Sequence, residues 1–131
     1  MYLGRLDEAR SRQEAALVIQ RDLGNRRGEG TVLGNLASAN FQLGRMDEAR
    51  AQYEQALAIH REVGNRVVEG SVLSNLAGLH YVQGRKDESR ACCEMALAIH
   101  HEMGDRRSVG IVLGNLGILH QIGRASCRER V

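Results

Sequence analysis

The 131-residue chain carries a formal net charge of +2, and its acidic and basic residues are interspersed. No basic patch stands out that would indicate a nucleic-acid partner or a membrane surface. Three Tyr, one Phe and no Trp exclude an aromatic-rich globular core, whereas the many Leu, Val, Ile and Ala residues suit thin layers of closely packed helices.

The N-terminal residues Met1–Arg5 run directly into charged residues and do not form a signal peptide, and no apolar run reaches membrane-spanning length. The three cysteines, Cys92, Cys93 and Cys127, are odd in number and lack the spacing of a disulfide framework. This usage is typical of a reducing compartment, so we expect a cytoplasmic location.

A shift of forty residues aligns the chain with itself without a gap, which is the signature of a repeat protein. Glycines, asparagines and apolar residues recur together in this register, as in Gly24, Gly64 and Gly104, in Ile19, Ile59 and Ile99, and in Asn35, Asn75 and Asn115. The period predicts a solenoid over residues 1–121, with a partial unit at 1–27, complete units at 28–67 and 68–107, and a partial unit at 108–121.

Each complete unit is expected to form two antiparallel helices. The first predicted helix of the chain, at about residues 6–23, is the second helix of the partial unit. From Met46 to Val63, apolar or small residues recur at the three-and-four spacing of one helix face. Gly64 ends this helix, and Asn65 is placed to cap the next, which ends near Gly84. The last predicted helix covers residues 108–121. The two faces expected to be buried are Ala49, Tyr53, Ala56, Leu57, His60 and Val63, and Val72, Leu73, Leu76, Ala77 and His80.

Glycines also occur inside the predicted helices, where each costs about 1 kcal/mol relative to alanine. We expect Gly30, Gly70 and Gly110 in the turn that precedes a helix, where the cost is smaller. The other glycines are expected where two helix backbones approach closely, so that packing offsets the lost helix propensity, with fraying of the helix ends as the alternative. These are Gly34, Gly78, Gly114 and Gly117.

These units resemble the tetratricopeptide repeat family, a helix-turn-helix unit with small residues at fixed places. Here these places correspond to Ala37, Ala49 and Ala56, with Tyr53 at the usual aromatic position. The LxNLA and GRxDEA phrases are similar to the long, forty-residue variety found in kinesin light chains, Pins-type polarity adaptors and bacterial signalling proteins. Leu33 stands in place of the family's early Trp, and its terminal Pro is missing. The resemblance implies an all-α, right-handed superhelical solenoid of antiparallel helix hairpins with about six helices.

Both ends of the chain fall inside a unit, so we expect a fragment of a longer array whose uncapped ends can self-associate. Residues 122–131 depart from the period and are identical to one reading frame of a common short-read sequencing adapter. We interpret them as translated adapter, with a natural basic tail as the alternative. This tail is expected to be disordered or to fray from the last helix.

No pattern in the sequence indicates catalysis, a metal site or a cofactor. The five histidines do not form a ligand spacing on one helix, and no second cysteine pair accompanies Cys92 and Cys93 for zinc. We interpret Cys93 as a core residue, and His80 and His120 as repeated packing residues rather than as a pair. The chain is therefore expected not to be an enzyme.

The first helix of each unit is expected to line the inner face of a curved stack. Its polar side offers the recurring asparagine. In the resembling family an asparagine here hydrogen-bonds the backbone of an extended peptide, a task that suits an amide because it both donates and accepts. The alternative is that these amides hold neighbouring helices together. The groove candidates are Asn35, Asn75, Asn115, Ser38, Gln42, Ser71, Val82 and Ile118.

Two classes of function follow from this pattern. The first is a scaffold that binds a peptide or protein segment in its concave groove. The second is a structural or regulatory arm of a larger signalling protein, such as an ATPase, a kinase or a transcription regulator, that self-associates without binding free peptide. Neither class involves nucleic acid or a membrane.

Overall fold

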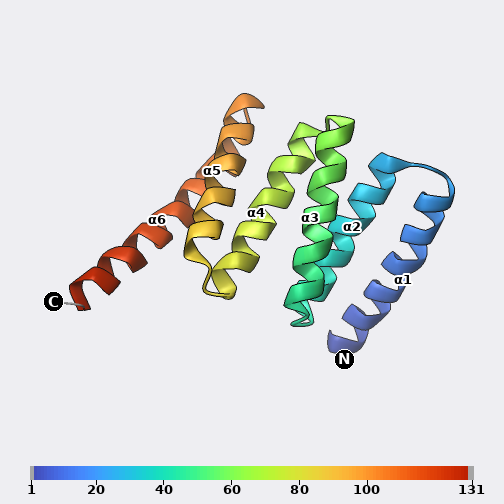
Figure 1. Ribbon diagram of the computed structural model, residues 1–131, viewed down its shortest axis with the longest axis horizontal. Helices are drawn as coiled ribbons and strands as arrows, with labels where there is room; N and C mark the ends of the chain where they lie inside the picture. Colours follow the sequence, from blue (N-terminus) through green and yellow to red (C-terminus); the bar gives the residue numbers. More distant parts are fainter. Residues whose placement is uncertain (1, 130–131) are drawn as a thin grey trace.

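The computed structural model describes the backbone of residues 2–129 and the side chains of residues 4–118. Within this part of the chain, the secondary structure consists of six helices and no strands, which confirms the predicted all-α class (Figure 1). The helices are α1 (Tyr2–Asp22), α2 (Arg26–Gln42), α3 (Met46–Val63), α4 (Arg66–Val82), α5 (Lys86–Glu102) and α6 (Arg106–Glu129).

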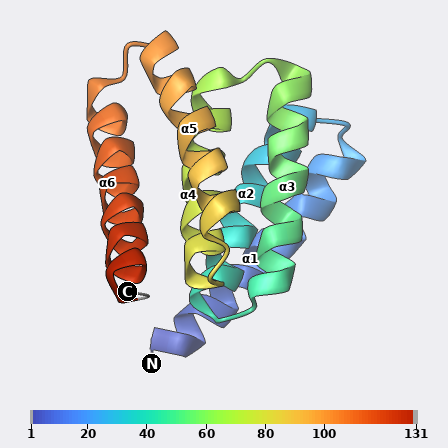
Figure 2. The ribbon, with the colours of Figure 1, turned by 60° about the vertical axis from the view of Figure 1, so that its left-hand side comes forward.

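The helices form a solenoid of helix hairpins in which each helix contacts the next one along the chain. Figure 1 shows this row, with α1 at one end and α6 at the other, and in Figure 2 α6 lies at the left-hand edge while α1 overlaps α2 and α3. The hairpins α2–α3 and α4–α5 are the two complete units. Helix α2 also contacts α4 across the repeat. Between first helices of successive units, contact is therefore made by α2 and α4, and an inner layer lined by all first helices remains a prediction.

Five turns separate the helices, and each contains a glycine with a positive φ of 68° to 80°. The residue after each glycine donates its backbone N–H to a carbonyl five positions earlier, at 2.8–3.0 Å. This arrangement satisfies the last helical carbonyls, and glycine adopts the required conformation without a steric penalty. The predicted helix end at Gly64 is thereby confirmed. Asn65 occupies the N-cap position of α4, but its side chain makes no capping hydrogen bond there, unlike Asn25, whose Oδ1 accepts from the Gly28 N–H at 3.1 Å.

The first and last helices are longer than the sequence predicted. Helix α1 begins at Tyr2, and Gly4 lies inside it although it aligns with the turn glycines Gly44 and Gly84. No helix precedes α1 in the described residues, so no turn is required at Gly4. Helix α6 continues through residues 122–129, where a disordered or fraying tail was expected. This segment contains no proline, and without a turn to a further helix nothing interrupts the backbone hydrogen bonding.

The core runs along the interior of the stack and is built from small and aliphatic side chains. The two predicted faces are confirmed: every member is buried except Val63, which is half-buried. Alanines at 37, 49, 56, 77 and 96 are almost fully buried, so the helix axes can approach closely. Cys93 is buried as predicted, and Cys92 is buried beside it.

The helical glycines are distributed differently from the expectation. Gly30, Gly70 and Gly110 lie inside α2, α4 and α6, not in the preceding turns. Gly30 and Gly70 pack against the second helix of their own unit, and Gly28 of α2 faces the flexible side chains of Gln20 and Asn25. A Cβ at Gly30 would lie 2.9 Å from Ile59 Cγ2, and a Cβ at Gly70 would lie 2.8 Å from His100 Cε1. No heavy atom would lie within 4 Å of a Cβ at any of the four glycines expected to be crowded, Gly34, Gly78, Gly114 and Gly117. The expectation of close approach at those four was wrong.

Substitution of the two glycines of α4 should therefore have opposite effects. Gly70→Ala gains helix propensity but crowds the buried His100 and Ile99, and overpacking of about 1–3 kcal/mol should outweigh that gain. Gly78→Ala, in the same helix but facing open space, should stabilise by about 0.5–1 kcal/mol. Thermal unfolding followed by circular dichroism measures both. If the two variants change the melting temperature equally and in the same direction, the packing described for Gly70 is contradicted.

A repeated ion-pair network connects the helices at one edge of the stack. The buried carboxylate of Glu69 accepts from Arg61 Nε and Arg66 Nη1, both at 2.9 Å, and Arg66 Nη2 also reaches Glu102 at 2.5 Å. The preceding unit repeats this network with Arg21, Glu29, Arg26 and Glu62.

The electrostatics of Glu29 show how this network acts. Burial raises the pKa of its carboxyl, but the hydrogen bonds from Arg21 and Arg26 outweigh burial and hold the pKa below its usual value. The carboxylate is therefore favoured in its charged form and links α1 to α2. In the third unit Val109 occupies the equivalent position, so the network does not extend to α6.

Glu69→Gln should destabilise the chain, because it removes a buried charge that accepts hydrogen bonds from two arginines. The expected loss is about 1–3 kcal/mol. Glu102→Gln is the matched control in the same network, and its exposed side chain should contribute much less. Urea denaturation compares the two. A Glu102 variant as unstable as the Glu69 variant would show that burial of the carboxylate is not what matters.

Candidate functional site

The first pocket on the inner layer lies between α2, α3 and α4 and has a volume of about 250 Å³. Its polar wall is organised by Tyr53, whose hydroxyl lies 2.7 Å from Ser38 Oγ. Ser38 donates its own proton to the Gly34 carbonyl at 3.1 Å, so Tyr53 is the donor to Ser38. Burial raises the pKa of Tyr53, which keeps the phenol protonated for this hydrogen bond. The pocket is lined by Ser38, Phe41, Gln42, Tyr53, Ser74, Asn75 and Gly78.

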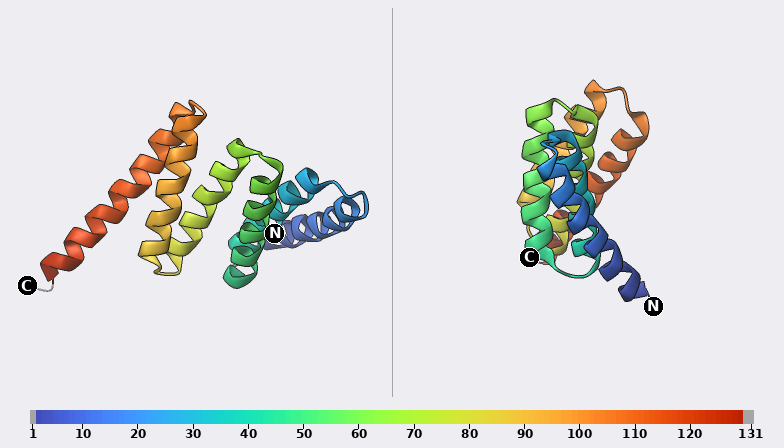
Figure 3. Two further views of the ribbon diagram at one scale, coloured as in Figure 1. Left: turned by 45° about the horizontal axis from the view of Figure 1, so that its top comes forward. Right: turned by 90° about the vertical axis from the view of Figure 1, so that its right-hand side faces the viewer.

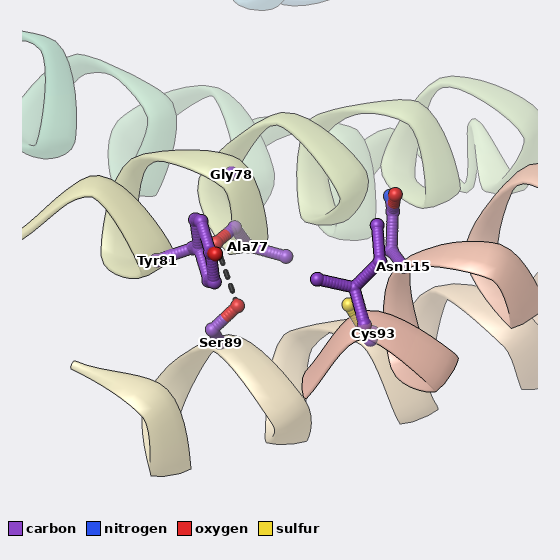
Figure 4. Close-up of a pocket in the computed structure, with 7 residues that line it drawn as sticks. Ala77, Gly78, Tyr81, Ser89, Cys93 and Asn115 are labelled. Carbon is purple, nitrogen blue, oxygen red and sulfur yellow. Dashed lines mark hydrogen bonds between the residues drawn. The ribbon is translucent and has the colours of Figure 1, made fainter. Parts of the chain in front are cut away.

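The second pocket lies between α4, α5 and α6 and has a volume of about 120 Å³ (Figure 4). In Figure 4 Ser89 Oγ donates to the Ala77 carbonyl, at 2.8 Å, and this pins α5 to α4 at the pocket wall. Asn115 and Cys93 lie on the α6 and α5 sides. The pocket is lined by Ala77, Gly78, Tyr81, Ser89, Cys93, Asn115 and Ile118.

The two pockets are equivalent under the forty-residue shift. Each pocket has an aromatic side chain, Phe41 in the first and Tyr81 in the second. Each also has an asparagine from the first helix of the next unit. They differ in polarity, because Cys93 replaces Tyr53 and Ile118 takes the position of Gly78. The second pocket is therefore smaller and less polar. No charged side chain lines either one.

The three recurring asparagines are all exposed on the first helices. Within residues 4–118 none of their side chains makes a hydrogen bond to a neighbouring helix. Asn75 and Asn115 line the pockets, whereas Asn35 lines neither of them. The amides are thus available to a ligand.

The pockets include only some of the predicted groove residues. Ser38, Gln42 and Ile118 line them together with two of the asparagines. Ser71 and Val82 are exposed outside them, and Ser71 Oγ donates to the Val67 carbonyl of its own helix at 3.3 Å. The sequence interpretation missed Phe41, Tyr81 and Ser74 as lining residues. The recurrence of an aromatic residue at 41 and 81 was the available signal for the first two.

Two family models, each described as Tetratricopeptide repeat, match the chain at residues 1–62 and 70–103. The chain belongs to the tetratricopeptide repeat family. No curated protein matches it. Among solved structures, it is similar to the crystal structure of BtubC (BKLC) from P. vanneervenii, with 21% sequence identity and a TM-score of 0.67. The match covers 92% of this chain and 59% of that one. Tetratricopeptide repeats generally mediate protein–protein interactions and are generally non-catalytic scaffolds.

Except for the exposed His101, the histidine and cysteine side chains that the structure describes are buried in this tetratricopeptide repeat chain. His60, His80 and His100 are buried, as expected for packing residues, while the side chain of His120 lies outside the described residues. Burial raises the pKa of both Cys92 and Cys93, which disfavours the reactive thiolates. Among residues 4–118 no three His, Cys, Asp or Glu side chains gather as metal ligands. In the described part of the chain, every helix is too short or too polar to cross a membrane.

The buried histidines should make stability depend on pH. Burial lowers the pKa of His60 and His80 in the folded array, so the unfolded chain binds more protons once the pH falls through about 6.5. Stability should therefore be full near pH 7 and decline toward pH 5. The chain itself offers matched replacements, since Gln20 and Asn40 stand at the equivalent positions. In His60→Gln/His80→Asn the melting temperature should change less between about pH 7 and pH 5. A decline equal to that of the parent chain would contradict this assignment.

Proposed function

We propose that this chain is a protein–protein interaction scaffold that binds an extended peptide segment of a partner across its inner layer. The observation that carries this proposal is the pair of equivalent pockets, each with an exposed asparagine and neither closed by a side chain of the array. A ligand that spans both pockets must itself have a repeating form, as an extended polypeptide does.

The asparagines suit the backbone of such a segment. Each amide offers both a donor and an acceptor, so Asn75 and Asn115 can each pair with a peptide C=O and N–H whatever the peptide sequence. The alternative role, in which they hold neighbouring helices, lacks a hydrogen bond to support it within the described side chains. Binding through the backbone would fix the direction and register of the segment.

The pockets would then select side chains of the segment. Their volumes of about 250 and 120 Å³ are below those of pockets for whole small molecules, so each fits one side chain rather than a cofactor. The first offers the hydroxyl group of Ser38 and the amide of Gln42, which favours a polar side chain. The second, with Cys93 and Ile118, favours a small aliphatic one. Because neither is lined by a charge, the bound segment is expected to be uncharged at these positions.

This proposal is tested with a peptide selected from a random display library on the parent chain. Asn75→Ala/Asn115→Ala should raise its Kd about 10- to 100-fold, because each lost hydrogen bond contributes about 1 kcal/mol or somewhat more. Gln55→Ala, an exposed amide on α3, is the matched control and should leave Kd unchanged. Fluorescence anisotropy of the labelled peptide measures both. Unchanged binding by the double variant would remove the asparagines from the proposed site.

The second candidate function is a structural or regulatory arm that self-associates, within a larger signalling protein such as an ATPase, a kinase or a transcription regulator. Exposed apolar side chains on α1 and α6 favour it. For either function we propose a cytoplasmic location, because Cys92 and Cys93 are both free thiols.

A further inference from the structure

Helix α6 exposes a face that its counterparts bury. Leu33 of α2 and Leu73 of α4 are 2% and 1% exposed, whereas the equivalent Leu113 is 51% exposed. The difference lies in the neighbours, since α2 and α4 are each covered by the second helix of their own unit. Among the described helices, none covers α6 on this side. This surface therefore has the shape and chemistry of a first helix that lacks its second helix.

Helix α1 exposes the complementary face. Ile59 of α3 and Ile99 of α5 are 5% and 4% exposed, whereas the equivalent Ile19 is 56% exposed. Its neighbour Val18 is 58% exposed, but the equivalent Ala58 and Ala98 are exposed as well. The apolar surface of α1 is therefore the one by which a second helix packs on the first helix of its own unit.

We propose that two copies of this chain associate head to tail, with α1 of one copy packed on α6 of the other to complete a unit. The hairpins α2–α3 and α4–α5 provide two internal templates for this interface. In the same register, Leu113 of one copy would be covered as Leu33 and Leu73 are, by Ile19 and its neighbours on the second copy.

The glycine of α6 fits this register. Gly30 and Gly70 receive the ring of His60 and His100, respectively, but no heavy atom would lie within 4 Å of a Cβ at Gly110. The residue of α1 that is equivalent to the two histidines is Gln20, whose side chain lies against Gly28 of its own α2. The space beside Gly110 would therefore leave room for the α1 backbone of the second copy to approach, and the apolar contact would come from Ile19.

The charges at the interface are also complementary. Within the two hairpins Arg26 pairs with Glu62 at 2.6 Å and Arg66 pairs with Glu102 at 2.5 Å. The equivalent residues at the two open faces are Arg106 and Asp22, a pair of opposite charge. Neither forms an ion pair within the side chains that the structure describes. Across the proposed interface they would face each other.

The shapes of the two end helices allow this contact. Figure 3 shows the N-terminal part of α1 projecting past the ends of its neighbours. A turn joins the helices of an internal hairpin, but two separate chains need none, so α1 can lie along α6 without one. Because the two faces differ, the interface is heterologous, and repeating it adds further copies until a ring closes or a filament grows.

This assembly rests on the second candidate function, self-association, and does not require peptide binding in the groove. Sedimentation velocity tests it. The parent chain should form oligomers whose size increases with concentration. Ile19→Glu and Leu113→Glu should each be monomeric at concentrations where the parent associates, because each places a charge in every α1–α6 contact. Val18→Glu is the matched control and should associate like the parent. Helicity and melting temperature, measured for each variant, show that it is folded.

Mixing the two variants provides the sharpest test. The intact α6 of Ile19→Glu should bind the intact α1 of Leu113→Glu, and growth should stop at a dimer because both remaining faces carry a glutamate. Association abolished by only one of the variants would indicate a symmetric contact, which overturns the head-to-tail register but leaves self-association standing. A parent chain that stays monomeric at all accessible concentrations would overturn both the head-to-tail register and self-association. The exposed faces of α1 and α6 would then be assigned to further helices of a longer array.

A charge exchange tests the register by another route. Asp22→Arg and Arg106→Asp should each weaken association, and the two substitutions combined in one chain should restore it. These residues are exposed, so the variants should fold. If both single variants associate more weakly and the combined variant does not regain association, the pairing of Asp22 with Arg106 is overturned.

Discussion

The constraint on which this array depends is that each internal helix needs apolar neighbours on two sides. Leu33, Leu73 and Leu113 are the same residue in the same register, yet only the first two are buried. Their local sequences are nearly alike, so the neighbouring helix decides whether the side chain leaves water. The hydrophobic free energy therefore belongs to the contacts between helices rather than to any one helix, as in other linear arrays.

The two pockets lie on the side that this packing leaves uncovered. A first helix uses one side for its own second helix and another for the preceding unit, and its remaining side carries Asn75 or Asn115. Aromatic residues at 41 and 81 lie at the border between the packed and the open side, where they form pocket walls. The ion pairs of Glu29 and Glu69 lie elsewhere on the stack, near the turns, and hold adjacent helices together without adding charge to the pockets.

The forty-residue period was sufficient to predict the helical class, the turns and the buried faces, because each of these repeats with the sequence. It was not sufficient for contacts that depend on a second helix. Gly30 and Gly34 are both glycines of α2, and only the position of Ile59 and His60 makes one crowded and the other open. Likewise, the hydrogen bond between Ser38 and Tyr53 joins residues of two helices, so the first pocket became visible only when those helices were placed together.

The proposed peptide site and the proposed head-to-tail interface use different sides of a first helix. Together they explain why Asn35 recurs in the sequence although it lines no pocket in a single chain. In a single chain this asparagine lines neither pocket, because among the described helices no first helix precedes α2. In the head-to-tail assembly, α6 of one copy would precede α2 of the next at the spacing of one unit. Asn35 of the second copy would then continue the series of Asn75 and Asn115, and Gln13 of that copy would take the position of Tyr53 and Cys93. A third pocket would form between the copies, so association would lengthen the groove, and a peptide long enough to span it would stabilise the assembly by mass action.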